Sequence, residues 1–271
     1  MPELPEVETT VRGLARVLEG ARIEHVVLSR PDMRFPFPDG MVQSLTSATV
    51  TSLARRAKYG LIHTSRENTL IFHLGMSGRW RIDPEMPDKH DHLIIETARH
   101  RLALNDPRRF GFVDLIRTDT LESWPAFAAM GPEPLGDDFS AEYLRTALKG
   151  RKAAIKLMLL DQHIVAGLGN IYVCEALHLA GIRPEKPAGK VSKPALARLV
   201  PAIRDVLTRS IADGGSTLRD YAAPSGELGY FATRFAVYGR EGQPCLSKDG
   251  GTIRRLVQGG RSTWYCPHCQ Q

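Results

Sequence analysis

The sequence has few cysteines. Only four occur among 271 residues, and three of them fall in the final 27 residues. So small and uneven a set argues against a disulfide framework and favours a metal site near the C-terminal end. The fourth, Cys174, lies in the apolar stretch IYVCEAL and is expected to be a small buried side chain.

Long apolar runs are also absent. No stretch approaches the ~18 residues of a membrane-spanning helix, so we expect no membrane partner. The first ten residues, MPELPEVETT, are acidic and proline-rich, which excludes a signal peptide and makes the cytoplasm the expected location. With 42% hydrophobic and 24% charged residues, the chain is not disordered and can form cores in one large domain or two ordinary ones.

Acidic residues are outnumbered by basic ones, which gives a net charge of +6. Such an excess agrees with a polyanionic partner but does not establish one. The imbalance is greater in the tail, where four basic residues follow Cys245 and Asp249 is the single acid.

Hydrophobic periodicity predicts a helix at residues 5–18, with Pro5 in its first turn and Gly20 after its end. About eight short stretches with β-branched residues and alternation follow between residues 22 and 116, separated by turn residues. This pattern is typical of a sandwich or a barrel.

A loop-like segment, GPEPLGDDFS, separates the strands from a helical region. Ser140 is the expected N-cap of its first helix, Gly214–Gly215 the expected end of its last, and Pro201 is predicted to kink or split that last helix. We therefore predict an α+β, multidomain protein. Its parts are a β-sandwich domain with a leading helix at residues 1–130, a linker at 131–139, a helical domain at 140–236 and a hairpin at 237–271.

The N-terminus offers an unusual chemical group. The initiator Met is normally removed ahead of proline, which would leave Pro2 with a free secondary amine. An α-amino group titrates at about 7.7–8.0, against about 10.4 for lysine, so more of it is neutral at working pH. Such an amine can attack an aldehyde-like carbon and form an iminium, with Glu3 and Glu6 as proton carriers. The alternative is structural, because Met-Pro beginnings are common and glutamates complement a helix N-terminus.

Other motifs have ordinary structural explanations when each is taken alone. Lys58 suits a solvated turn, and the turn-like motifs HLGMSG and NDPRRFG carry Met76 and Phe110, which would ordinarily be core residues. The motif GLGN gives a tight turn whose backbone N–H groups could approach a phosphate. The motif HDH is half of a metal site, as in a metallohydrolase, but strand alternation explains it equally well.

In combination and in this order, the motifs resemble those of the formamidopyrimidine-DNA glycosylases, bacterial enzymes that repair oxidised purines. The resemblance extends over essentially the whole chain, and no single motif would suffice for it. The motifs are MPELPEVE, ARRAKY, HLGMSG, KHDH, NDPRRFG, GPEPL, GLGNIY, GGSTLRDY, VYGREGQPC and QGGRSTWYCPHCQ.

The resemblance implies a DNA glycosylase that is also an abasic-site lyase. Pro2 would attack C1′ of the damaged nucleotide and form a Schiff base. Glu3 would protonate the sugar ring oxygen with the support of Glu6, and Lys58 would lie near the damaged base. Excision and β,δ-elimination would leave phosphates on both sides of a gap. An enzyme that reaches C1′ has to extrude the nucleotide, at a cost on the order of a few kcal/mol.

The same resemblance implies which residues contact DNA. Met76, Arg108 and Phe110 would fill the space of the extruded nucleotide and hold the widowed cytosine. The motif GLGNIY corresponds to a helix–two-turn–helix element. Further contacts are implied for His73, His92, Arg109, Lys156, Asn170, Arg219, Tyr230 and Arg261. The family often has Lys in place of Arg219, which keeps the charge but changes the geometry. The implied partner is double-stranded DNA with an oxidised base, bound by a monomer.

Two other functions agree with parts of the sequence. The endonuclease VIII branch shares the fold and the Pro2 chemistry but prefers oxidised pyrimidines, and it differs in the residues after Pro2 and in the residues that replace the extruded base. A non-catalytic DNA-binding zinc-ribbon protein would suit the basic tail, because phosphate contacts alone give affinity. That function leaves Pro2 and Lys58 without a role.

The tail departs from the family pattern, in which the finger has two Cys-x-x-Cys pairs. Only Cys245, Cys266 and Cys269 are present, and Lys248 stands where the other cysteine should be. We expect one structural zinc ion with Asp249 as the candidate fourth ligand, because carboxylate oxygen binds zinc at about 2.0–2.2 Å.

Two alternatives to Asp249 remain open for the tail. His268 is a chemically better ligand, but it points awkwardly if the thiolates on both sides of it bind the metal. The other alternative is a metal-free hairpin held by the packing of Ile253, Trp264 and Tyr265.

Overall fold

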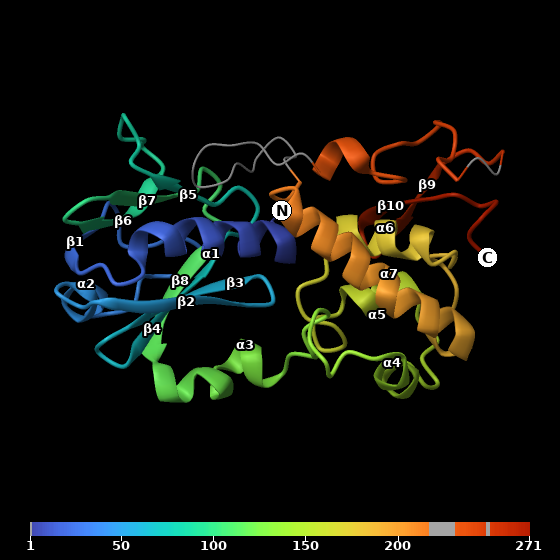
Figure 1. Ribbon diagram of the computed structural model, residues 1–271, viewed down its shortest axis with the longest axis horizontal. Coiled ribbons are helices and arrows are strands. Elements are labelled where there is room, and N and C mark those ends of the chain that lie inside the picture. The colour runs from blue at the N-terminus through green and yellow to red at the C-terminus, as the bar shows by residue number, and fades with distance from the viewer. Residues whose placement is uncertain (1, 217–230, 248–249) are drawn as a thin grey trace. The chain divides into compact units, whose positions relative to one another are not determined.

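The structure is a computed structural model that describes residues 2–216, 231–247 and 250–271. The chain forms two compact units (Figure 1). Unit 1 consists of Met1–Ala128 and Ile211–Ala232, and unit 2 of Ala129–Ser210 and Thr233–Gln271. A segment after the last long helix therefore groups with the N-terminal unit, whereas the sequence-based division put it in the helical domain.

Unit 1 begins with helix α1 (Leu4–Leu18), which starts one residue earlier than predicted. A capping box opens it: the Glu3 backbone N–H donates to Glu6 Oε2 at 2.9 Å, and the Glu3 side chain accepts from the Glu6 N–H. The apolar face of α1 is buried, and Gly20, with a φ of 77°, follows its end as predicted.

Eight strands form two antiparallel sheets of four strands each. The first sheet has the order β1-β6-β7-β5, with the bounds Ile23–Leu28, Asp91–Thr97, Arg101–Asn105 and Arg79–Ile82. The second has the order β2-β3-β4-β8, with the bounds Val50–Arg56, Tyr59–Thr64, Asn68–His73 and Phe112–Arg117. Buried side chains from both sheets and from α1 form a single apolar cluster. The predicted β-sandwich with a leading helix is therefore confirmed.

Short elements complete unit 1. They are helix α2 (Met41–Leu45), the 3-10 helix η1 (Thr118–Ser123) and helix α3 (Pro125–Ala128). Helix α1 packs mainly against β2 and β3, so the first residues of the chain are held by the sandwich.

Unit 2 is mainly helical, as predicted. Its helices are α4 (Ala141–Ala147), α5 (Ile155–Leu160), α6 (Asn170–Leu179), the 3-10 helix η2 (Ala188–Lys190) and most of α7 (Lys193–Ala212). The last two residues of α7 and the first two of the 3-10 helix η3 (Phe231–Arg234) group with unit 1. The Ser140 side chain accepts a hydrogen bond from the Tyr143 N–H at 3.1 Å and is the N-cap of α4, as expected.

Helix α7 is continuous through Pro201, so of the two predicted effects, a kink or a split, the split is wrong. Proline removes the N–H that would bond the carbonyl of Ala197 one turn earlier. Both residues are exposed, so water can satisfy that carbonyl. The helix ends at Ala212, and Gly214–Gly215 follow it with positive φ, as predicted.

The tail of unit 2 is a β-hairpin of β9 (Arg254–Gln258) and β10 (Arg261–Tyr265). Gly259 and Gly260 connect the strands with φ of 53° and 72°, as a tight two-residue hairpin turn requires. Cys174 of α6 is fully buried in a cluster with residues of the tail, which confirms its predicted burial. None of the helices within the described residues has the length and hydrophobicity that a membrane crossing requires.

Candidate functional site

The first residues of the chain are buried. Pro2 is buried, and the side chains of Glu3 and Glu6 are 3% and 2% exposed at the N-terminal end of α1. The first turn of a helix leaves N–H groups without partners in the helix, and the two glutamate side chains accept from such groups through the capping box. The structure thus brings together the proline and the two glutamates that the sequence singled out.

The Glu6 carboxylate hydrogen-bonds to two segments of unit 1 that are far apart in the sequence. Its Oε2 accepts from Glu3, and its Oε1 accepts from the Ser216 N–H at 2.8 Å and the Ser216 hydroxyl at 2.9 Å. Gly215 adopts a φ of 84°, and a Cβ there would lie 3.2 Å from Glu6 Oε1. Glu6 therefore holds the backbone of Glu3 and the turn after α7, which is a positioning role. Sequence reasoning missed Ser216, whose partner is distant in the chain.

Lys58 lies in the turn between β2 and β3 and is 8% exposed, so the expectation of a solvated turn cation is wrong. Ala57 beside it has a φ of 53°, which is uncommon for a residue with a side chain. The charge of Lys58 acts on His73, at the end of β4.

His73 is neutral at physiological pH. Burial, and then the positive charges of Lys58 and Arg34, lower its pKa to about 4. The Gly75 N–H donates to His73 Nδ1 at 3.1 Å, so the neutral ring carries its proton on Nε2. A neutral imidazole with one N–H can donate to a phosphate oxygen without adding charge to the site.

Two loops of unit 1, at residues 74–78 and 106–111, carry Met76, Arg108 and Phe110; we call them the paired loops. Met76 is half-buried, whereas Arg108 and Phe110 are exposed. The Arg108 guanidinium lies over the Phe110 ring at 4.7 Å. An exposed aromatic side chain beside a cation suits insertion into a base stack better than it suits the core.

Asp106 joins the paired loops. This fully buried carboxylate accepts hydrogen bonds from the Ser77 hydroxyl at 2.6 Å and from the Gly111 N–H at 2.8 Å. The loops also touch directly, since a Cβ on Gly75 would lie 2.3 Å from Gly111 N. Sequence reasoning treated Asp106 only as part of a turn, although an aspartate before proline is a usual signal for a side chain that bonds its own turn.

Two of the expected contact residues in unit 1 have protein partners. His92 is 2% exposed, and its Nε2 lies 2.9 Å from the carbonyl of Asp106, so it supports the paired loops; its expected contact with DNA stays a prediction. Arg109 is exposed with a φ of 55°, and its guanidinium lies 3.4 Å from Asp32.

In unit 2, Lys156, Asn170 and Arg261 meet around β10. The Lys156 ammonium donates to Thr263 Oγ1 at 2.6 Å and to the Ser262 carbonyl at 3.2 Å, and the Asn170 amide donates to the same carbonyl at 2.9 Å. Lys156 is fully buried and its ammonium holds β10, while its expected contact with DNA stays a prediction. Arg261 is exposed at the start of β10, next to the carbonyl that Lys156 and Asn170 fix.

The motif GLGN forms the turn before α6. Gly167 adopts a φ of 82°, and its N–H donates to Gln162 Oε1 at 2.8 Å. Gly169 is the N-cap of α6 and has no side chain to bond the first N–H groups of the helix. These N–H groups can bind a phosphate, with Asn170 at the first helical position.

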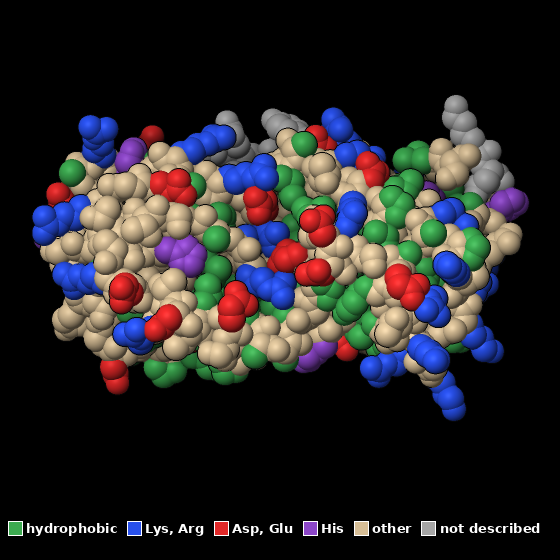
Figure 2. Space-filling model, turned by 60° about the horizontal axis from the view of Figure 1, so that its bottom comes forward, with side chains coloured by type: hydrophobic (Ala, Val, Ile, Leu, Met, Phe, Trp, Pro, Cys, Tyr) green, Lys and Arg blue, Asp and Glu red, His purple; other side chains and the backbone are tan. Residues whose placement is uncertain are grey.

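Three of the expected site residues lie outside the described residues: Arg219, Tyr230 and Asp249. On the face seen in Figure 2, Lys and Arg side chains are interspersed with Asp and Glu side chains. The positive charge is therefore not gathered into one patch on that face. A polyanion bound there would be held by individual basic side chains and not by a continuous basic surface.

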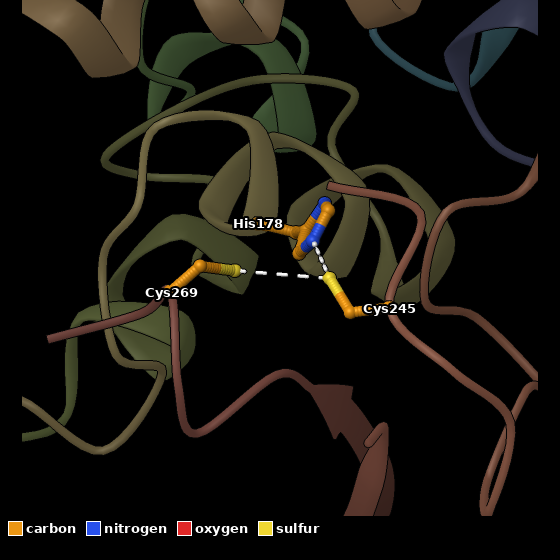
Figure 3. Close-up of side chains that lie close together, drawn as sticks. All are labelled: His178, Cys245 and Cys269. Atoms are coloured by element: carbon orange, nitrogen blue, oxygen red, sulfur yellow. Dashed lines mark hydrogen bonds between the residues drawn. The ribbon is translucent and has the colours of Figure 1, made fainter. Parts of the chain in front are cut away.

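The tail cysteines meet a histidine of α6 (Figure 3). His178 Nε2 lies 3.4 Å from Cys245 Sγ, which lies 4.0 Å from Cys269 Sγ, and the three ligand atoms all fall within 4.8 Å of one another. The Cys266 side chain hydrogen-bonds to those of Cys245 and Cys269. A group of three sulfurs and one imidazole nitrogen is the donor set of a Cys₃His structural zinc site, so these residues fit zinc.

Sequence reasoning missed His178. It lies 67 residues from Cys245, in a helix with an apolar surrounding, and nothing in its local sequence marks it as a ligand. The sequence pointed to such a ligand only indirectly, because a zinc finger with three cysteines needs a fourth donor from another part of the chain. His268, the alternative within the tail, is exposed.

Glu175, also on α6, binds the segment that leads into the tail. Its carboxylate accepts from the backbone N–H groups of Ala236, Val237 and Tyr238 at 2.8, 3.0 and 2.8 Å. Burial raises the pKa of Glu175, and the three N–H donors oppose that rise. Glu175 and His178 are three positions apart, so they project from the same face of α6.

Family comparisons agree with this arrangement. The chain matches the formamidopyrimidine-DNA glycosylase N-terminal domain over residues 1–113 and the formamidopyrimidine-DNA glycosylase H2TH domain over residues 130–222. Residues 250–271 match the zinc finger found in FPG and IleRS.

Known relatives are similar over their whole length. The formamidopyrimidine-DNA glycosylases of Erythrobacter litoralis and Novosphingobium aromaticivorans are 74% and 66% identical to the chain, each with full coverage of both sequences. Among solved structures, Lactococcus lactis Fpg in complex with DNA that contains an abasic site is 37% identical, with a TM-score of 0.92 and full coverage of both chains. MutM (Fpg) from Thermus thermophilus is also 37% identical, with a TM-score of 0.89, 99% of this chain and 98% of the other being covered.

Proposed function

The chain belongs to the formamidopyrimidine-DNA glycosylase family, and from that premise we propose that it excises oxidised purines from duplex DNA and then cleaves the strand at the resulting abasic site. The substrates would be 8-oxoguanine and formamidopyrimidines. The buried group of Pro2, Glu3 and Glu6 at the start of α1 is the observation that carries this proposal.

The chemistry would begin at Pro2. Its nitrogen bonds to C1′ of the damaged nucleotide, while the bond from C1′ to the base breaks and its electrons leave with the base. The proton that the Pro2 nitrogen then loses balances the proton that the departing base takes up. Glu3 gives a proton to the ring oxygen O4′ as the sugar opens, which leaves an iminium between Pro2 and C1′. The Glu6 carboxylate accepts from Glu3 and from Ser216, so its role is to fix the backbone of the two reacting residues.

Strand cleavage would follow from the same iminium. Loss of a proton from C2′ expels the 3′ phosphate, and loss of a proton from C4′ expels the 5′ phosphate, so a gap remains with a phosphate on each side. Water then hydrolyses the iminium and frees Pro2. Lys58, buried and close enough to His73 to act on its pKa, would supply positive charge near the damaged base.

Base extrusion would depend on the paired loops. Met76 and Phe110 would replace the lost stacking, and the Arg108 guanidinium would hold the unpaired cytosine. The bonds of Asp106 to both loops support this role, because a side chain that inserts into DNA needs a rigid base.

DNA would also be held by His73, His92, Arg109, Lys156, Asn170 and Arg261, and by Arg219 and Tyr230 from the residues outside the described ones. The finger would carry one structural zinc ion, held by Cys245, Cys266 and Cys269, which ties the ends of the tail together and keeps Arg261 in place. We expect a monomer that works in the cytoplasm, with the chromosomal DNA.

Borohydride trapping tests the reaction. With a duplex that contains 8-oxoguanine opposite cytosine, the wild type should give a nicked strand and a covalent adduct, because borohydride reduces the iminium. Pro2→Gly should lose most of both products. Pro5→Ala is the matched control, since Pro5 lies in α1 without a chemical role, and it should still be trapped.

The outcome separates the alternatives. Full trapping by Pro2→Gly would remove Pro2 from the reaction. Faster excision of thymine glycol than of 8-oxoguanine would favour the endonuclease VIII type of activity, and binding without nicking would favour a non-catalytic protein.

A further inference from the structure

The finger of this chain lacks one of the thiol ligands of its family pattern, and α6 brings a histidine to the remaining three. His178 is buried, as are Cys245 and Cys266. Its ring and the Cys269 side chain both point toward the Cys245 sulfur, and they come from two different parts of unit 2 (Figure 3). A buried imidazole among thiols is unusual, because an apolar side chain would fill the same volume without needing a polar partner.

Two of the separations are close to those of a tetrahedral site. With zinc–sulfur and zinc–nitrogen bonds of about 2.3 and 2.0–2.1 Å, two sulfurs lie about 3.8 Å apart, and a sulfur and a nitrogen about 3.5 Å apart. The observed separations are 4.0 Å between Cys245 Sγ and Cys269 Sγ and 3.4 Å between His178 Nε2 and Cys245 Sγ. The atoms of His178, Cys245 and Cys269 all lie within 4.8 Å of one another.

The third thiol lies beside the other two. Cys266 is buried, its side chain hydrogen-bonds to those of Cys245 and Cys269, and the backbone N–H groups of His268 and Cys269 donate to its sulfur. His268 is exposed on the Cys-x-x-Cys turn and is not among the residues whose ligand atoms lie within 4.8 Å of one another. The tail therefore offers three sulfurs, and α6 offers the nitrogen.

We propose that His178 is the fourth ligand of the finger zinc and takes the place of the missing cysteine, in preference to Asp249. This inference rests on the zinc part of the proposed function and is independent of the reaction at Pro2. The site is of the Cys₃His type, with a net charge of −1 instead of the −2 of four thiolates. A finger that presents Arg261 to a phosphate gains from the smaller negative charge.

The consequence is mechanical. A zinc ion bound by four tail cysteines would tie only the tail to itself, whereas His178 ties the tail to α6. Glu175 reinforces the connection through its three backbone hydrogen bonds. The same helix begins at Asn170, so zinc would couple the position of the finger to the helix N-terminus that is expected to bind phosphate.

Metal analysis of purified wild type and variants tests the proposal. His178→Phe fills the volume without a donor atom, His178→Cys restores a thiol ligand, and Asp249→Asn and His268→Ala are matched controls. Wild type, Asp249→Asn and His268→Ala should each hold one zinc per chain. His178→Phe should lose zinc to a competing chelator at least ~100-fold more readily, since loss of a mere supporting residue already costs about 10–100-fold. His178→Cys should retain the metal, which shows that the site still folds.

Cobalt substitution gives a second readout. The intensity of the thiolate-to-cobalt absorption should correspond to three thiolates in the wild type and to four in His178→Cys. Hydrogen exchange at the end of α6 should accelerate when zinc is removed from the wild type.

Each result has a definite meaning. Zinc binding that survives His178→Phe but fails in Asp249→Asn would overturn the assignment of His178. A wild type that holds no zinc after refolding with the metal would overturn the zinc site itself, and borohydride trapping by that protein would show that the reaction stands apart from it.

Discussion

The paired loops of unit 1 and the finger of unit 2 present similar side chains by different means. Each carries an exposed arginine close to buried polar groups: Arg108 in the paired loops and Arg261 in the finger. In the paired loops one carboxylate, Asp106, joins both loops through hydrogen bonds alone. In the finger the support comes from α5 and α6, through Lys156, Glu175 and the group of thiols with His178.

The difference shows two ways to fix a side chain that is proposed to contact DNA. The paired loops carry their own support within a few residues on each side, so their geometry depends only on the fold of unit 1. The finger is too small for a core of its own and depends on a neighbouring helix and a metal. Changes to one support should therefore leave the other intact.

The largest loss of stability is expected for Asp106→Ala. Hydrogen bonds to a buried charged group contribute about 1.5–3 kcal/mol each, so the loss of those from Ser77 and Gly111 should lower the free energy of unfolding by about 3–5 kcal/mol. Urea unfolding measures this change. Asp119→Asn, in an exposed ion pair with Arg117, is the control and should leave the urea midpoint nearly unchanged. Zinc content should be unchanged in both; if Asp106→Ala lost zinc, the two supports would not be separate.

Gly75→Ala should lower the free energy of unfolding by about 2–4 kcal/mol. Its Cβ would meet the backbone of the opposite loop, and backbone cannot move aside as a flexible side chain can. That Cβ would lie 2.3 Å from Gly111 N. Gly20→Ala has a similarly positive φ but nothing within 4 Å. Gly20→Ala should lower the free energy of unfolding by only about 1 kcal/mol. Thermal unfolding compares the pair. Equal losses would mean that the loops do not need their close contact.

Lys156→Met should lower stability by about 1–3 kcal/mol, because the bonds to Thr263 and Ser262 are lost inside unit 2. As Lys156 is buried, the salt dependence of DNA binding should change little. Arg261→Ala should have the opposite profile, with unchanged stability and a salt slope reduced by about 0.9. A reduced slope in Lys156→Met would instead indicate a direct phosphate contact.

The smallest effect concerns pH and His73. Its pKa is about 4 in the folded protein, so between that value and the unfolded value of about 6.5 the unfolded chain binds more protons. The stability contributed by neutral His73 is therefore complete above about pH 6.5 and is lost as the pH falls toward about 4. His73→Gln should show a flatter decline in urea midpoint over this range. An identical decline in both proteins would contradict the role of His73.

Local patterns predicted much of the fold. Helix α1, the eight strands, the Ser140 cap and the glycine stop after α7 follow from side-chain period and turn chemistry, which act over a few residues. The continuity of α7 through Pro201 could not be predicted, because it depends on which face of the helix meets water.

The residues of the candidate site could be predicted only where they belong to recognisable sequence motifs. Pro2, Glu3, Met76 and Phe110 were found through their order in the chain, not through local chemistry. His178 and Ser216 act on partners 67 and 210 residues away, and no local rule connects residues at that separation. The buried state of His92 and Lys156 likewise depends on tertiary packing.

Identification of the trapped residue tests the central claim most directly. After borohydride reduction on DNA with 8-oxoguanine and digestion with trypsin, the sugar adduct should be found on the peptide PELPEVETTVR, at Pro2. An adduct on a lysine, above all Lys58, would contradict the account, because the reacting amine would then lie in the turn between β2 and β3 instead of at the start of α1.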